Sequence, residues 1–255
     1  MKIIIFYLFS LLLTIEGRAA IILLDPGHGG EDVGATNKMK DGSLLREKDL
    51  VLELAKEIKH QLSFYQHQVY LTRNRDEFIK LDERALMADK LNADIYISIH
   101  LNSSPKKSSR GHEIYYANSQ SNKAISHLES LENMQFGEHD KEIDMVIADI
   151  ILQKTAPYSK RLAAFVDAEL NLKENKKRGP LKGLLNRGIK SALFYVLLLS
   201  KRPAILLEVA FLSNKNDQKK ILQKSFQKEY AQKVASGIHK YLLSEEESLI
   251  ASRQK

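Results

Sequence analysis

The sequence contains no cysteine, and this absence excludes several kinds of chemistry at once. Disulfides, catalysis by a thiolate, zinc bound through cysteine and anchoring through an acylated lipoprotein cysteine all need that residue. A metal ion would therefore have to be bound by histidine, aspartate or glutamate. The chain also lacks an internal repeat and a linker rich in proline, glycine or serine, so nothing in it marks a boundary between two folded domains.

Long apolar runs are equally scarce, and the one that stands out lies at the N-terminus. Lys2 precedes a mainly apolar run at residues 3–13, and Gly17, Ala19 and Ala20 provide small residues after it, which is the layout of a secretory signal. The run is shorter than the roughly 20 apolar residues that span a bilayer, so an uncleaved anchor is a weaker interpretation, as is a buried first strand. We expect residues 1–20 to be a signal peptide and the mature chain to be exported, to the periplasm or beyond, without stable membrane insertion.

Basic residues outnumber acidic ones, which gives the 255-residue chain a formal charge of +7. Removing residues 1–20 takes away two basic residues and one acidic residue, so the mature chain stays basic. An exported basic protein meets anionic polymers such as wall glycans and lipid head groups, and the alternative interpretation of the charge is an ordinary solvated surface. Nucleic acid is not an expected partner outside the membrane.

The apolar pattern predicts strands that alternate with helices. The expected strands are Ile21–Leu24, Val69–Thr72, Asp94–His100, Gly111–Tyr116, Ala192–Leu199 and Pro203–Phe211. The expected helices are Glu47–Leu62, Leu81–Leu91, two between Asn118 and Leu172, and Asn216–Leu243. This order predicts one α/β domain over residues 21–243, with a mostly parallel, mixed and twisted sheet of about six strands covered by helices on both faces. Residues 244–255 are expected to be a polar C-terminal tail.

Four polar side chains occupy positions where such a sheet forms its ligand crevice, beyond the carboxyl ends of the strands. His28 follows the first strand in a glycine-rich loop, His100 ends the third, Glu47 opens the first helix, and Glu208 lies within a buried strand. Two histidines and a carboxylate with one open position are what a hydrolytic zinc site requires. Each residue also has a purely structural interpretation. His28 could occupy a turn, His100 could be a core histidine, and Glu47 could be an acid placed favourably at a helix N-terminus.

Glu208 is the residue that a purely structural role explains least well. Its neighbours Ile205, Leu206, Leu207 and Val209 are apolar, so the carboxylate loses hydration and needs a partner. A purely structural role would require a cation, for which Arg187 or Arg202 is available. The spacing of these residues alone leaves the metal site and the structural roles both open, because no compact metal-binding motif is present.

Several segments, taken together, resemble the zinc-dependent N-acetylmuramoyl-L-alanine amidases. The matching pieces run in order from Ile21 to about Leu243: Leu24–Gly30, Arg46–Glu47, Leu71–Arg73, Ser98–Asn102 and Leu207–Asn214. The resemblance implies that His28, Glu47 and His100 bind Zn²⁺ and that Glu208 is the general base. It also implies hydrolysis of the amide between the lactyl group of N-acetylmuramic acid and L-alanine in peptidoglycan.

The sequence departs from the family pattern at three places. Leu101 stands where a small residue is common, and Ala210 stands where glycine is common, which puts the fit of the substrate in doubt. Some division amidases also carry a helix that plugs the site until a protein activator removes it. The corresponding stretch here, Asn133–Glu142, is short, so we expect an open or lightly gated site.

Two other functions remain consistent with the residues. A zinc carboxypeptidase acting on wall peptides would use Glu31 as a ligand in place of Glu47, because His28 and Glu31 have the spacing H-x-x-E. A non-catalytic wall-binding module would keep the fold without the chemistry. All four key side chains are present, which favours an enzyme.

Overall fold

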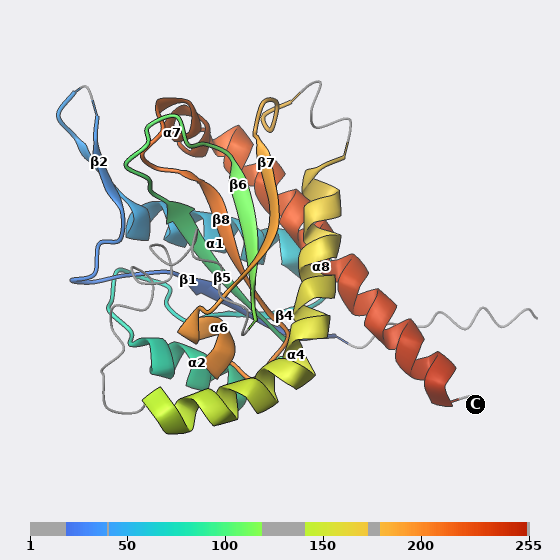
Figure 1. The fold of residues 1–255 in the computed structure, drawn as a ribbon. Coiled ribbons are helices and arrows are strands. Elements are labelled where there is room, and N and C mark those ends of the chain that lie inside the picture. The colour runs from blue at the N-terminus through green and yellow to red at the C-terminus, as the bar shows by residue number, and fades with distance from the viewer. Residues whose placement is uncertain (1–18, 40, 119–140, 173–178, 254–255) are drawn as a thin grey trace, which may run out of the picture.

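The protein is described from a computed structural model that covers residues 19–39, 41–118, 141–172 and 179–253 (Figure 1). Nearly all of the expected signal peptide, residues 1–18, lies outside the described residues. The six strands of the main sheet are β1 Ile21–Pro26, β4 Gln68–Leu71, β5 Ile95–Asn102, β6 His112–Ala117, β7 Asn186–Ala192 and β8 Ala204–Phe211. They lie in the order β4-β1-β5-β8-β6-β7.

The sheet is mixed, as expected. Strands β4, β1, β5 and β8 are parallel, whereas β6 runs antiparallel to β8 and β7 follows β6 in parallel. Every residue of β5 and β8 is buried. Strand β8 is apolar apart from Glu208, as expected of a strand covered on both faces, whereas β5 carries Ser98, His100 and Asn102 between its apolar residues. The carboxyl ends of β1, β5 and β8 therefore meet at one edge, where a crevice can form.

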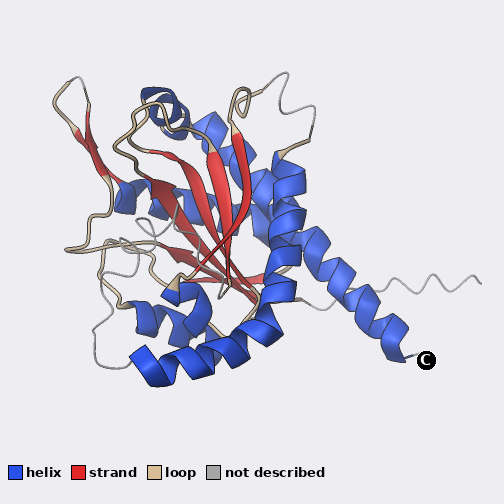
Figure 2. Cartoon of the chain, in the orientation of Figure 1, coloured by secondary structure: helices blue, strands red, loops and turns tan. Residues whose placement is uncertain are grey.

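Helices cover both faces of this sheet, so the strands form one layer between two helical layers (Figure 2). The helices are α1 Glu47–Ser63, α2 Leu81–Lys90, α4 Lys141–Leu170, α6 Tyr195–Leu199, α7 Lys215–Ile221 and α8 Lys224–Arg253. Apolar residues of α1 and α8 pack on one face, and those of α2 and α6 on the other. None of the helices within the described ranges is long and apolar enough to cross a membrane.

Helix α4 serves both faces because it bends near its middle, where Pro157 lies (Figure 1). Proline lacks the N–H that the preceding turn needs, so it kinks a helix. Leu152, before the bend, joins the core beside α6, whereas Leu162 and Val166, after it, join the core beneath α8. The prediction of two helices here was wrong: both apolar segments belong to one kinked helix, and residues 119–140 lie outside the described part.

Two more element boundaries differ from the expectation. The strand predicted at Ala192–Leu199 lies earlier, at β7, and its apolar end is the short helix α6. A short buried apolar run has no periodicity that separates strand from helix. The closing helix is divided into α7 and α8, and α8 continues past Leu243 to Arg253, so the predicted polar tail is largely helical.

A buried ion pair holds the end of β1 against α2. Arg84 donates to the carboxylate of Asp25 at 2.8 Å and to the carbonyl oxygens of Pro26 and His28. Burial alone raises the pKa of Asp25, but Arg84 and the hydroxyl of Thr72 lower this pKa from 3.8 to about 2. The ionised pair therefore stabilises the fold above pH 3.8, and its contribution is lost as the pH falls towards 2.

Replacing Arg84 by methionine should lower the free energy of unfolding by about 3 to 5 kcal/mol, because it leaves a buried carboxylate without its counter-ion. The matched control is Arg75→Met, which breaks a pair of equal length, 2.8 Å to Glu77, in which the arginine is 78% exposed. That change should cost about 1 kcal/mol or less. If urea unfolding gave the same loss of unfolding free energy for both variants, the buried pair would stabilise the fold no more than the exposed one.

Candidate metal centre

The loop after β1 places His28 at the carboxyl edge of the sheet. Its backbone adopts the left-handed conformation, with φ of 58°, which is uncommon for a residue other than glycine. The backbone N–H of Gly27 donates to the carbonyl of Ile99 at 3.0 Å, which ties the loop to β5. A Cβ atom at Gly27 would overlap the ring of His100, so only glycine lets this loop pass so close to the histidine.

Glu47 is the first residue of α1 and follows directly from the hairpin of β2 Thr36–Lys38 and β3 Leu44–Arg46. Its carboxylate is buried and accepts two backbone N–H groups, from Ala35 at 2.8 Å and from Leu101 at 2.8 Å. These bonds link the loop after β1 with the end of β5 through one side chain. They hold the carboxylate in a single position with an edge facing the two histidines.

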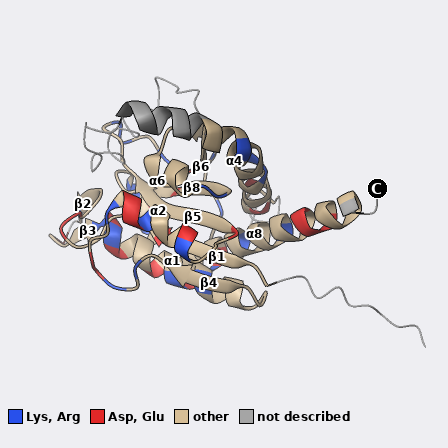
Figure 3. Ribbon diagram, turned by 90° about the horizontal axis from the view of Figure 1, so that it is seen from below, with Lys and Arg blue, Asp and Glu red and all other residues tan. Residues whose placement is uncertain are grey.

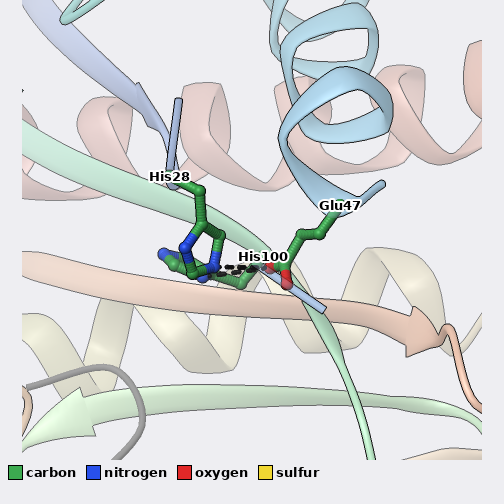
Figure 4. A group of neighbouring side chains, drawn as sticks. All are labelled: His28, Glu47 and His100. Atoms are coloured by element: carbon green, nitrogen blue, oxygen red, sulfur yellow. Dashed lines mark ion pairs between the residues drawn. The ribbon is translucent and has the colours of Figure 1, made fainter. Parts of the chain in front are cut away.

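His28, Glu47 and His100 converge at one point (Figure 4). Oε1 of Glu47 lies 3.2 Å from Nε2 of His28 and 3.2 Å from Nδ1 of His100. The two imidazole rings are 4.9 Å apart between centroids and nearly perpendicular, and the three ligand atoms all lie within 4.8 Å of one another. A tetrahedral ion with bonds of about 2.0 to 2.2 Å separates its ligand atoms by roughly 3.2 to 3.6 Å, so this group fits one.

The charges around this group favour a cation. Burial opposes ionisation of Glu47, but His28 and His100 beside it hold its pKa below the ordinary range. Nδ1 of His28 bonds Oδ2 of Asp32 at 2.9 Å, which directs Nε2 towards the centre. Such a carboxylate orients a metal-binding histidine and raises the basicity of its other nitrogen.

Glu208 lies on β8 directly opposite His100 on β5, so both side chains leave the same face of the sheet. It is almost completely buried. The two arginines considered as its counter-ions bond other carboxylates: Arg187 bonds Glu113, and Arg202 bonds Asp89. The geometry thus brings all four predicted site residues to one edge of the sheet.

Three acidic residues near the site were not identified from the sequence. Asp32 bonds His28, Asp25 pairs with Arg84, which donates to the carbonyl oxygen of His28, and Glu113 lies directly opposite Glu208 on the antiparallel strand β6. Glu113 was detectable in principle, because it is an acid within a short strand of apolar and aromatic residues. Asp32 has no such signal, since it lies in a polar loop.

Glu31 does not join the histidines. Its side chain is exposed, and the ligand group found among the described residues contains Glu47 in its place. The geometry therefore speaks against the carboxypeptidase interpretation that depends on Glu31. The segment Asn133–Glu142, considered as a gate, lies almost entirely outside the described residues.

Fold and site together define an α/β domain with a candidate metal site of two histidines and one carboxylate at the carboxyl edge of its sheet. The chain belongs to the N-acetylmuramoyl-L-alanine amidase family Amidase_3, whose pattern matches residues 22–240. This match covers nearly all of the domain that the sequence predicts.

Relatives with this family's name resemble the chain over most of its length. The amidase AmiC of Neisseria meningitidis is 35% identical across 89% of this chain, and AmiC of Escherichia coli is 33% identical across 88%. The chain spans only 54% and 53% of those two proteins. It therefore corresponds to about half of each relative.

Solved structures agree with the fold. The amidase AmiC2 of Nostoc punctiforme superposes with a TM-score of 0.60 at 28% identity, over 89% of this chain and 99% of that one. The CwlD amidase of Clostridioides difficile, solved with the GerS lipoprotein, has a TM-score of 0.63 at 25% identity, over 88% of this chain and 99% of that one. The single α/β domain is thus the architecture of amidase catalytic domains.

Replacing Glu47 by alanine should abolish stoichiometric metal binding, because it removes the atom that both histidines face. Glu31→Ala is the matched control, three residues after His28 but exposed, and should bind one ion like the unaltered protein. The metal content of both variants after dialysis is measured by inductively coupled plasma mass spectrometry. Loss of the ion from Glu31→Ala with retention by Glu47→Ala would reverse the assignment of the ligands.

Proposed function

We propose that the chain hydrolyses the amide between the lactyl group of N-acetylmuramic acid and L-alanine in peptidoglycan. The observation that carries the proposal is the convergence of His28, Glu47 and His100, in which Oε1 of Glu47 lies 3.2 Å from a ring nitrogen of each histidine. Membership of the amidase family supports the choice of bond. Zinc is the proposed ion, because two imidazoles and one carboxylate form a ligand set typical of hydrolytic zinc sites, with a position left for substrate or water.

A divalent ion in this site would stabilise the negative charge that develops on the carbonyl oxygen of the scissile amide. Glu208 is the proposed general base, which accepts a proton from the attacking water. It then donates that proton to the L-alanine nitrogen, which cannot leave as an anion. Asp32 orients the ring of His28, and Gly27 passes close to the ring of His100 and limits its movement.

The setting we propose for this reaction is the cell wall, reached by export through the signal peptide at residues 1–20. Peptidoglycan is then the macromolecular partner. Basic and acidic residues are both present on the outer helices α1, α2 and α8 (Figure 3). A protein activator is a further proposed partner, supported by the complex of the CwlD amidase with a lipoprotein.

The test of this function is Glu208→Gln. We expect the variant to keep its metal ion but to lose hydrolysis by about 10²- to 10⁴-fold, since proton transfer by a positioned group contributes that much. The matched control is Glu169→Gln. Glu169 is another buried glutamate, which lies on α4 and bonds Ser236 and Lys240 of α8, so this variant should keep full activity.

The measurement is mass spectrometry of purified sacculi after digestion. Products with a free L-alanine amino group and intact glycan confirm the bond that is cut. Cleavage between two amino acids would instead identify a peptidase, and undiminished turnover by Glu208→Gln would exclude this residue as the base.

A further inference from the structure

A second buried carboxylate lies beside the proposed general base. Glu113 on β6 is the register partner of Glu208 on β8, and Glu208 in turn is the partner of His100 on β5. These three residues form one row across adjacent strands, and residues in register leave the same face of a sheet. Oε2 of Glu113 accepts hydrogen bonds from Asn102 at 3.0 Å and from the hydroxyl of Tyr115 at 2.7 Å.

The other oxygen of Glu113 holds two cations from β7, the next strand of the sheet. Nε of Arg187 and Nζ of Lys190 both donate to Oε1. These cations keep the pKa of Glu113 below its ordinary value, against the raising effect of burial. The buried carboxylate of Glu113 thus holds Arg187 and Lys190 next to the strand that carries Glu208.

Arg187 is held in place while part of it stays accessible. Its guanidinium carbon lies 5.2 Å from the ring centroid of Phe211, and its side chain is 34% exposed. Within the described part of the chain its hydrogen bond to Glu113 uses Nε alone, so Nη1 and Nη2 make no hydrogen bond there. A carboxylate on one edge and an aromatic ring on one face orient the group before any ligand arrives.

A guanidinium fixed in this way suits one kind of ligand. Its planar pair of terminal nitrogens matches the two oxygens of a carboxylate, whereas an ammonium offers only a point charge. Little conformational entropy is lost on binding, because Glu113 and Phe211 already restrict the side chain. Arg187 lies on β7, one strand beyond Glu113, and bonds the carboxylate that stands directly opposite Glu208, the proposed general base.

We propose that Arg187 binds the free α-carboxylate of the second residue of the peptide stem. In peptidoglycan that residue is a glutamate joined through its side chain, so its α-carboxyl group remains free next to the L-alanine of the scissile bond. The inference rests on the proposed amidase function and adds the part of the substrate that is recognised. Arg187 is then a specificity-determining residue, and Glu113 and Phe211 position it.

The experiment compares three muramoyl tetrapeptides with the metal-loaded protein. The first has all carboxyl groups free, the second has the α-carboxyl of the second residue converted to an amide, and the third has only the terminal carboxyl converted. We expect kcat/KM to be about 10- to 100-fold lower for the second substrate than for the first, as for loss of a hydrogen bond between charged groups. The third should match the first.

Arg187→Met should bring the ratio of the first two substrates close to one, and Arg187→Lys, which keeps the charge without the fork, should leave an intermediate ratio. Lys190 still pairs with Glu113 in both variants. Arg202→Met is the matched control: this arginine is 30% exposed and also bonds a carboxylate, but it precedes β8 at the opposite edge of the sheet. It should keep the full ratio.

The other possible outcomes would each contradict a particular part of the proposal. Equal rates on the first two substrates by the unaltered protein, or an unchanged ratio in Arg187→Met, would exclude carboxylate recognition by Arg187 while leaving the amidase function intact. A penalty on the third substrate alone would assign the recognised carboxylate to the end of the stem. Failure to cleave any of the three would remove the amidase function itself, and this inference with it.

Discussion

The contact on which the site depends is the one between the carboxylate of Glu47 and its four neighbours. It accepts backbone N–H groups from Ala35 and Leu101 and faces the nitrogens of His28 and His100. A single buried side chain therefore joins the loop after β1, the start of α1 and the end of β5. Such an anion is stable in the apolar interior only where charge and hydrogen bonds compensate it, and a bound cation would complete that compensation.

The rest of the fold supplies rigid supports for this contact. Arg84 and Arg73, both buried, donate to carbonyl oxygens of the loop that ends in His28, and so fix its unusual backbone. The antiparallel strand β6 then extends the polar row across the sheet and brings Glu113 beside Glu208. The register of β6 on β8 places the two carboxylates next to each other, and β7, on the other side of β6, supplies the cations that pair with Glu113.

Much of this arrangement was accessible from the sequence. The buried strands β1, β5 and β8 and the helix α1 have strong apolar patterns, and His28 and His100 lie near the carboxyl ends of β1 and β5, which the sheet rule gathers at one edge. The metal-binding role of Glu47 and the catalytic role of Glu208 came from the resemblance to the amidase family. The boundaries near β7, α4 and α6 were not accessible. A kinked helix keeps its apolar period on both sides of Pro157, and a short buried helix has the composition of a strand. The roles of Glu113 and Arg187 depend on strand order, which local patterns do not contain.

The central claim is that His28, Glu47 and His100 bind one divalent ion. The most direct measurement is anomalous diffraction from crystals of the zinc-loaded protein, recorded on both sides of the zinc absorption edge. The account predicts a single strong peak within bonding distance of Nε2 of His28, Nδ1 of His100 and the carboxylate of Glu47. A peak bound by other residues, or none between these three at full zinc occupancy in solution, would contradict it.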